Sequence, residues 1–209
     1  MAKVLLLNGS PHSGGCTATA LEEMISVFEK EGIETELIQV GSHDIRGCIG
    51  CGKCRENKRC VFDDLVNEVA VKFAEADGLV VGSPVYYGSP NGTILAFMDR
   101  LFYSTGHIPK QMKVGAAVVS ARRGGNTASF DALNKYFTIS AMPVAAGTYW
   151  NQVHGFKAED VKKDLEGLQT LRNLARNMAF MIKAFADAKE KYGLPEMERG
   201  SFTSFSDGK

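Results

Sequence analysis

The chain has 209 residues, of which 44% are hydrophobic and 23% are charged, a composition that is ordinary for one globular domain. Its 24 Lys and Arg balance 24 Asp and Glu, so the charge gives no case for nucleic acid or an anionic membrane as the main partner. The apolar run at residues 3–7 is too short for a signal peptide, and no run reaches transmembrane length. We therefore expect a cytoplasmic protein with no membrane span and no nucleic-acid partner.

Strand-like and helix-like segments alternate along the first half of the chain. Residues 3–7 are a continuous apolar run, as in a strand buried on both faces of a parallel sheet. Residues 17–30 place apolar side chains at helical spacing. The pattern then predicts a strand at 34–40, a helix that begins at Asp63 and Asp64, a strand at 78–81 and a helix at 91–102.

The same alternation continues to the long helix near the end. We expect a strand at 114–119, a helix at 127–138, a short strand at 142–146 and a helix at 160–189. Residues 193–209, rich in Gly, Ser and charge, are expected to form a C-terminal tail that is loose or docked on a neighbouring subunit. Residues 1–192 then form one α/β domain, a doubly wound five-stranded parallel sheet between two helical layers.

Three loops follow strands one, three and four, at the edge where such sheets bind ligands. Residues 8–18, NGSPHSGGCTA, suit a phosphate, although a tight turn without a ligand fits equally well. Residues 82–92, GSPVYYGSPNG, hold two tyrosines that either face a flat conjugated ring or pack on their own domain. Residues 120–126, SARRGGN, offer donors to a ring carbonyl or form a solvated turn. At one edge, the three loops together predict a flavin mononucleotide (FMN) site.

With GSPHSGGCT at 9–17, GSPVYYGSPNG at 82–92 and FMDR at 97–100, the sequence resembles the NAD(P)H-dependent FMN reductases, which are flavodoxin-like proteins. The resemblance covers roughly the first three quarters of the chain. It implies strand order 2-1-3-4-5 and a homodimer or homotetramer in which a neighbouring chain helps to cover the flavin. The cysteine-rich block at 48–60 is similar to that of the iron–sulfur flavoproteins.

The resemblance also implies which residues bind FMN: the first loop holds the phosphate, the second the ribityl chain and ring, and the third the pyrimidine side. In chain order these residues are Ser10, His12, Cys16, Thr17, Ala18, Pro84, Val85, Tyr86, Tyr87, Gly88, Asn91, Ser120, Arg122, Gly124, Gly125 and Asn126. Arg122 is the candidate stabiliser of the anionic reduced flavin, and no side chain is expected to act as a catalytic acid or base.

Two positions depart from what relatives often carry. His12 stands in place of Arg, so we expect weaker phosphate binding. Cys16 stands in place of Asn, at a helix N-terminus that would lower the pKa of a thiol, but we favour a packing role for it.

Four of the five cysteines, Cys48, Cys51, Cys54 and Cys60, lie close together in the sequence. Four thiolates on a glycine-rich loop suit a 4Fe–4S cluster, and this is the leading hypothesis. Three alternatives stay open: a zinc ion on the same thiols, a redox-active pair of Cys48 and Cys51, or free thiols.

These features predict an FMN-dependent NAD(P)H oxidoreductase, in which a nicotinamide cofactor reduces the flavin and the flavin reduces a quinone, a free flavin, an azo or nitro compound, a protein or the cluster. The alternative hypothesis is an iron–sulfur flavoprotein that carries electrons between redox proteins and has no small-molecule substrate. The sequence does not distinguish NADH from NADPH, name the acceptor, or fix the oligomeric state.

Overall fold

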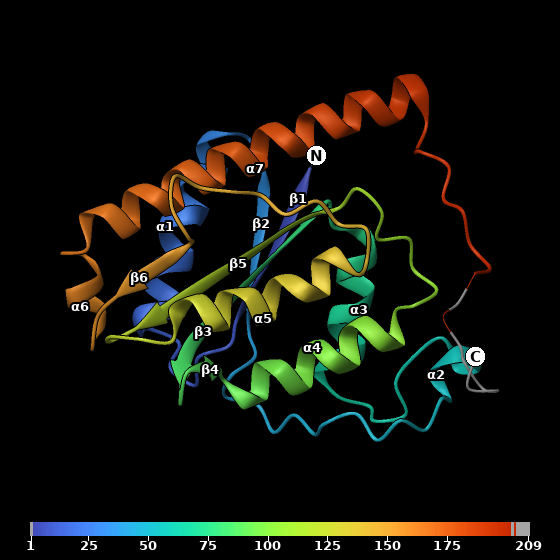
Figure 1. The fold of residues 1–209 in the computed structure, drawn as a ribbon, viewed down its shortest axis with the longest axis horizontal. Helices are drawn as coiled ribbons and strands as arrows, with labels where there is room; N and C mark the ends of the chain where they lie inside the picture. The colour runs from blue at the N-terminus through green and yellow to red at the C-terminus, as the bar shows by residue number, and fades with distance from the viewer. Residues whose placement is uncertain (1, 202, 204–209) are drawn as a thin grey trace.

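The computed structural model, described for residues 2–201 and 203, has a parallel sheet between two layers of helices (Figure 1). Across the sheet the parallel strands stand in the order β2 (Glu34–Gln39), β1 (Lys3–Asn8), β3 (Gly78–Tyr86), β5 (Val114–Ala121) and β6 (Gln152–His154). A two-residue strand, β4 (Ser89–Pro90), pairs antiparallel with the end of β3. When the parallel strands are counted along the chain, this order is the predicted 2-1-3-4-5, and the three-layer α/β fold is confirmed.

The helices divide between the two faces of the sheet. Helices α1 (Cys16–Lys30) and α7 (Leu165–Tyr192) share one apolar cluster with one face of the strands. Helices α3 (Leu65–Glu75), α4 (Gly92–Ser104) and α5 (Asn126–Thr138) share a second cluster with the other face. Two one-turn helices, α2 (Cys54–Asn57) and α6 (Ala158–Val161), complete the described helices.

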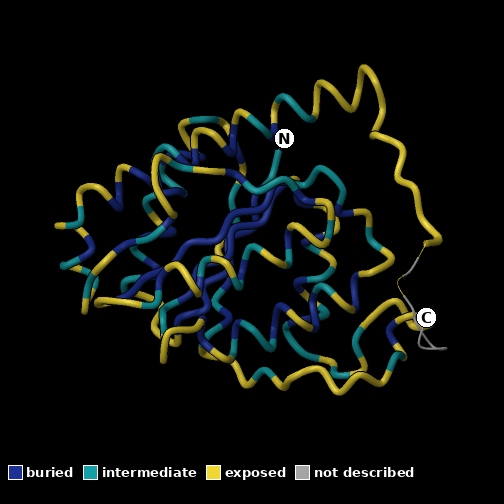
Figure 2. Tube along the Cα trace, viewed as in Figure 1, coloured by how far each residue is buried: buried dark blue, intermediate teal, exposed yellow. Residues whose placement is uncertain are grey.

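The central strands are buried on both faces, which is why their sequences are continuous apolar runs. In β1, Val4 and Leu6 lie in the cluster with α1 and α7, whereas Leu5 and Leu7 lie in the cluster with α3, α4 and α5. Figure 2 shows the resulting buried centre with exposed loops around it. The exposed loops at the ends of the strands therefore remain free to carry a site.

The predicted strand at 142–146 is wrong. That segment makes only an isolated bridge, between Val144 and Gly115, and its second residue, Pro143, has no N–H to donate. The chain then leaves the edge and returns at Asn151, whose carbonyl oxygen accepts from the N–H of Val119 at 3.0 Å. The fifth strand is consequently β6, ten residues later than predicted for its start.

Two further boundaries differ from the prediction. The third strand continues from Val81 to Tyr86, into residues that were predicted to be loop. The helix predicted at 160–189 is interrupted, because α6 ends at Val161 and Asp164 then caps a new helix by accepting a hydrogen bond from the N–H of Gly167 at 2.9 Å. The long helix thus begins at Leu165.

Helix α7 ends at Tyr192, before Gly193 with its positive φ of 75°. Beyond it, the carbonyl oxygen of Pro195 accepts a hydrogen bond from Gln111 at 2.9 Å. The predicted domain boundary at residue 192 and the docking of the tail on a neighbour stay predictions, and residues 202 and 204–209 of that tail lie outside the described residues. Among the helices described, none is long and apolar enough to cross a membrane.

Candidate functional site

Hydrogen bonds bring the three predicted loops together at the carboxyl edge of β1, β3 and β5. The N–H of Gly9 donates to the carbonyl oxygen of Gly82 at 2.8 Å. The buried hydroxyls of Thr17 and Ser120 lie 2.8 Å apart and join the loop after β1 to the end of β5. A ligand that contacts one of these loops is therefore within reach of the other two.

The loop after β1 leads into α1 with its first N–H groups unoccupied by a side-chain cap. The N-cap residue is Gly15, which has no side chain that could accept a hydrogen bond. By contrast, α3, α4 and α7 are capped by the side chains of Asp64, Asn91 and Asp164. Free N–H groups and the positive end of the helix dipole favour an anion at the start of α1.

The segment after β3 is a tight hairpin, not an open loop. Tyr87 and Gly88 form its turn with φ of 51° and 75°, as a two-residue hairpin turn with two positive φ values requires. The ring of Tyr87 is fully exposed at the tip, and Tyr86 is 44% exposed. Asn91 anchors the far side, because its N–H donates to the hydroxyl of Ser83 at 3.0 Å and its side chain caps α4.

The loop after β5 packs against this hairpin so closely that one position must be glycine. Gly125 has φ of 98°, and a Cβ there would lie 2.7 Å from Val85 Cγ1 and 2.8 Å from Gly88 Cα. The next residue, Asn126, is 5% exposed, and its Nδ2 is buried with no hydrogen-bond partner among the described residues. An unpaired buried donor is costly, so an acceptor supplied by a ligand would stabilise it.

All sixteen residues predicted to bind FMN lie on these three segments, at one edge of the sheet. The buried ones are Ser10, Thr17, Ala18, Asn91, Ser120 and Asn126, the half-buried ones are Cys16, Pro84, Val85 and Gly125, and the exposed ones are His12, Tyr86, Tyr87, Gly88, Arg122 and Gly124. The guanidinium of Arg122 lies 5.7 Å from the centre of the Phe156 ring. The role of each residue toward FMN stays a prediction.

Cys16 does not have the chemistry of an activated thiol. Burial raises its pKa above the ordinary value, and the carboxylates of Asp160 and Glu159 raise it further. A raised pKa does not favour a reactive thiolate, which agrees with the packing role favoured from the sequence.

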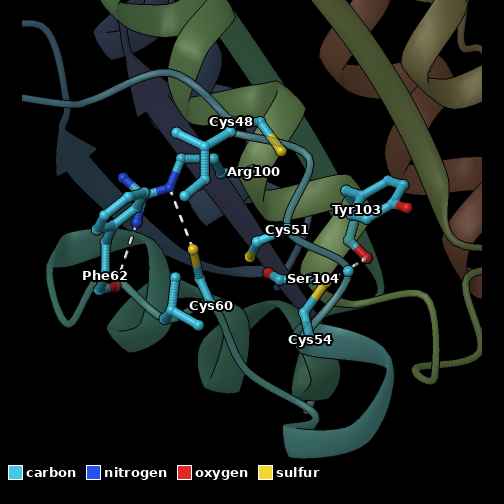
Figure 3. A pocket seen from close by; sticks show the side chains of 11 residues that line it. Cys48, Cys51, Cys54, Cys60, Phe62, Arg100, Tyr103 and Ser104 are labelled. Atoms are coloured by element: carbon cyan, nitrogen blue, oxygen red, sulfur yellow. Dashed lines mark hydrogen bonds between the residues drawn. The ribbon is translucent and has the colours of Figure 1, made fainter.

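The four clustered cysteines line one pocket at the far end of α4 (Figure 3). Cys48 and Cys51 are exposed, Cys60 is half-buried and Cys54 is buried, and all are free thiols. Burial raises the pKa of the Cys54 thiol. In the described chain, however, no three His, Cys, Asp or Glu side chains converge closely enough to hold a single metal ion.

Arg100, the last residue of FMDR, anchors this pocket from α4. Its side chain is only 1% exposed, yet all five of its N–H groups have acceptors. Nη1 donates to Asp64 at 2.6 Å and to the Arg46 carbonyl oxygen at 3.2 Å, while Nη2 donates to Asp64 at 2.9 Å and to the Phe62 carbonyl oxygen at 3.2 Å. Nε lies 3.3 Å from the sulfur of Cys60.

Sequence analysis missed this anchor, and it also missed Asn67. The side-chain oxygen of Asn67 accepts from the N–H of Cys60 at 2.9 Å, and its Nδ2 donates to the carbonyl oxygens of Cys60 and Phe62, each at 3.1 Å. FMDR was used only as part of the resemblance to the FMN reductases and was not connected with the cysteine block. No spacing rule links position 67 or 100 to a cysteine loop.

A family model described as NADPH-dependent FMN reductase matches residues 2–155, which include β1, β3, β5 and the three loops. The chain belongs to this family.

Within the FMN reductase family, the chain is similar to proteins named iron–sulfur flavoproteins. An iron–sulfur flavoprotein of Methanocaldococcus jannaschii is 34% identical over 188 residues, which cover 87% of this chain and 97% of the relative. This likeness places the chain among the iron–sulfur flavoproteins, as the cysteine block indicated.

Solved structures agree on the fold. RosB with bound 8-demethyl-8-formylriboflavin-5'-phosphate has a TM-score of 0.70 at 17% identity, covering 98% of this chain and 97% of that chain. A flavodoxin from the domain Archaea has a TM-score of 0.58 at 18% identity, covering 88% and 99%. The flavodoxin-like fold predicted for this FMN reductase family member is thereby confirmed.

Proposed function

We propose that this protein is an FMN-dependent oxidoreductase that takes electrons from NADH or NADPH and passes them to a small-molecule or protein acceptor. The observation that carries the proposal is the edge formed by the three loops. There an uncapped helix N-terminus and the unpartnered amide of Asn126 lie on segments joined by the hydrogen bond between Thr17 and Ser120. An anion at one end and a ring with hydrogen-bond acceptors at the other satisfy both features, and FMN has both.

The residues of this edge would bind and orient the flavin. The first N–H groups of α1 and the hydroxyl of Ser10 would hold the phosphate. Asn126 Nδ2 and the N–H groups around Gly125 would donate to the pyrimidine carbonyls, and Tyr86 would cover the ring. When bound, FMN supplies the hydride and electron chemistry, so the protein needs no catalytic acid or base.

The cysteine pocket would hold a 4Fe–4S cluster. Four thiols line a pocket whose other walls are largely apolar, and a cluster of this kind spreads its thiolates over four irons, so the sulfurs need not meet at one point. Zinc sites on four cysteines usually consist of two separated CxxC pairs, whereas here the four cysteines lie in one compact block, which favours the cluster over zinc. A redox-active or free thiol loop remains the outcome of a negative iron assay.

A second function, electron carriage between redox proteins, is favoured by the surface around the pocket. Cys48 and Cys51 are exposed, and Lys53, Arg55 and Lys58 are exposed beside them. A cationic rim around a cluster suits an acidic protein partner that docks transiently. If reduced protein partners, and not NADH or NADPH, reduce the bound flavin, this second function replaces the first.

The test begins with FMN and iron per chain in protein purified without oxygen, followed by anaerobic addition of NADH or NADPH. We expect one FMN and about four irons per chain and loss of the oxidised-flavin absorbance. Asn126→Leu should weaken FMN binding by about 10-fold or more, because it removes a donor that FMN would satisfy.

Asn134→Leu is the matched control, because Asn134 is on the same helix and also has an unpartnered buried atom, Oδ1. It lies two turns away from the edge and should leave FMN affinity unchanged. Equal affinities in the two variants, or no FMN bound at saturation, would contradict the proposed flavin site.

We also propose a homodimer or homotetramer in the cytoplasm, as the family resemblance implied. Helix α4 starts at the edge formed by the three loops, where FMN would bind (the flavin edge), and ends at the cysteine pocket. Its 13 residues make it about 20 Å long. A second chain that covers the flavin edge would shorten the path between the flavin and the cluster. Analytical ultracentrifugation of the loaded protein tests this; a monomer at all concentrations would exclude it.

A further inference from the structure

We infer that Arg100 positions the cysteine pocket and sets the reduction potential of the group bound there, by a hydrogen bond from its Nε–H to the sulfur of Cys60. This inference deepens the proposed function and rests on its cluster. It assigns a role to a side chain on α4 that touches no predicted flavin residue. Figure 3 shows a nitrogen of Arg100 directed at the sulfur of Cys60, and both side chains line the pocket.

The first step is the completeness of the hydrogen bonding. A guanidinium has five N–H groups in a fixed planar fork, and here four go to Asp64, Arg46 and Phe62 while the fifth goes to Cys60 at 3.3 Å. The plane of the fork is fixed by the two bonds to Asp64. Once that plane is fixed, the direction of Nε–H is fixed too, and it points at sulfur.

The second step is the cost of placing an arginine there. Burying an ion pair costs several kcal/mol in desolvation, and well-packed apolar residues would fill the same space equally well or better. An arginine guanidinium keeps its proton in proteins, and here it also has a carboxylate partner in Asp64. The guanidinium therefore stays a cation next to the sulfur, which a purely space-filling role does not require.

The third step is what a cation and an N–H donor do to a bound cluster. One-electron reduction of the cluster, with the reduced flavin as donor, adds one negative charge to the iron and sulfur atoms. Donors and cations close to a ligating sulfur stabilise the more negative state and raise the reduction potential. Asp64 has the opposite effect, and its carboxylate is separated from the sulfur by the guanidinium.

The loop geometry adds a positioning role. Arg100 also holds the carbonyl oxygens of Arg46 and Phe62, one on each side of the cysteine block. Its guanidinium carbon lies 5.1 Å from the centre of the Phe62 ring, and that of Arg46 lies 4.8 Å from the same centre. The side chain of Arg100 therefore holds the backbone at both ends of the cysteine block.

The experiment compares the midpoint potential of the bound cluster in wild type, Arg100→Lys and Asp64→Asn, followed by EPR, with iron and FMN per chain measured on the same samples. Arg100→Lys keeps a cation but cannot make the fork, so the ratio of reduced to oxidised cluster at a fixed potential should fall by about tenfold, which corresponds to a midpoint lower by about 59 mV for one electron. Asp64→Asn keeps Nε–H and removes a negative charge, so the potential should rise.

The opposite signs separate tuning from a merely structural role, because loosening the loop would lower the iron content of both variants without this pattern. If Arg100→Lys does not fold, Asp64→Asn still tests the inference, as does wild-type protein grown with ¹⁵N-arginine. The reduced cluster of that protein should show a weak ¹⁵N hyperfine coupling. An unchanged potential in Arg100→Lys, a lowered or unchanged potential in Asp64→Asn, or absence of the coupling would overturn the inference.

Two failures remain distinguishable. Iron-free wild-type protein that binds FMN and is reduced by NADH or NADPH would overturn the cluster and the inference together, but not the flavin function. Iron-loaded wild type with no effect of either variant would overturn the inference alone.

Discussion

Replacing Gly125 by Ala should separate the two loops that would enclose the flavin ring. The new Cβ would lie 2.7 Å from Val85 Cγ1 and 2.8 Å from Gly88 Cα, and the backbone has φ of 98°. A left-handed conformation costs an L-residue about 1–2 kcal/mol, and relieving such an overlap costs roughly 1–3 kcal/mol. The first cost acts on the folded state with or without a ligand.

The second cost falls mainly on flavin binding, because the loops can move apart in the free protein but must approach each other again around the ring. We expect the Kd for FMN to rise by about 10-fold or more and the free energy of unfolding of the apoprotein to fall by about 1–2 kcal/mol. Quenching of FMN fluorescence gives the Kd, and urea unfolding gives the stability.

Gly92→Ala is the control, because a Cβ at Gly92 meets nothing within 4 Å and its φ is not positive. It should bind FMN as the wild type does. If Gly125→Ala matches Gly92→Ala in both measurements, the packing of these loops does not govern the flavin site and the reasoning is refuted.

Three further outcomes are expected. Thr17→Val should cost about 1–3 kcal/mol in urea unfolding, and less in a Ser120→Ala background, because the two hydroxyls bond each other; equal costs would contradict this coupling. Cys51→Ser should lower iron per chain while Cys16→Ser does not, and equal iron contents would remove Cys51 from the ligands. Burial lowers the pKa of Lys110 to about 8 from 10.5, so the unfolded chain binds more protons between these values and stability rises with pH. From pH 8 to pH 10, the free energy of unfolding of the wild type, measured in urea, should rise by about 2 kcal/mol relative to that of Lys110→Met. A difference between the two proteins that does not change with pH would show that the pKa of Lys110 is not shifted.

The layers could be predicted because the central strands carry their signal locally, whereas the strand order came from the family resemblance. Residues 3–7 and 114–119 are continuous apolar runs, and a strand buried on both faces requires that pattern. The meeting of the three loops at one edge was predictable for a related reason. In a doubly wound sheet the topology alone places the loops after β1, β3 and β5 side by side, so their composition could be interpreted together.

The edge strand was not predictable by the same means. Residues 142–146 look more like a strand than residues 152–154, but Pro143 cannot complete a ladder and Gly147 packs where a Cβ would lie 2.8 Å from Thr170. The chain is turned away there by contact with α7. Such a tertiary contact overrides local propensity.

The cysteine block shows most clearly where sequence reasoning ends. Its spacing indicated a metal or redox site, but the partners of Arg100 lie 36 to 54 residues before it, and no local pattern records them. In the described chain, the backbone hydrogen bonds of residues 44–60 stay within the block itself, so no ladder fixes it to the sheet. Side chains must do so instead. Because α4 is held rigidly between the flavin edge and the core, a residue on its last turns is the fixed point against which Cys60 can be positioned.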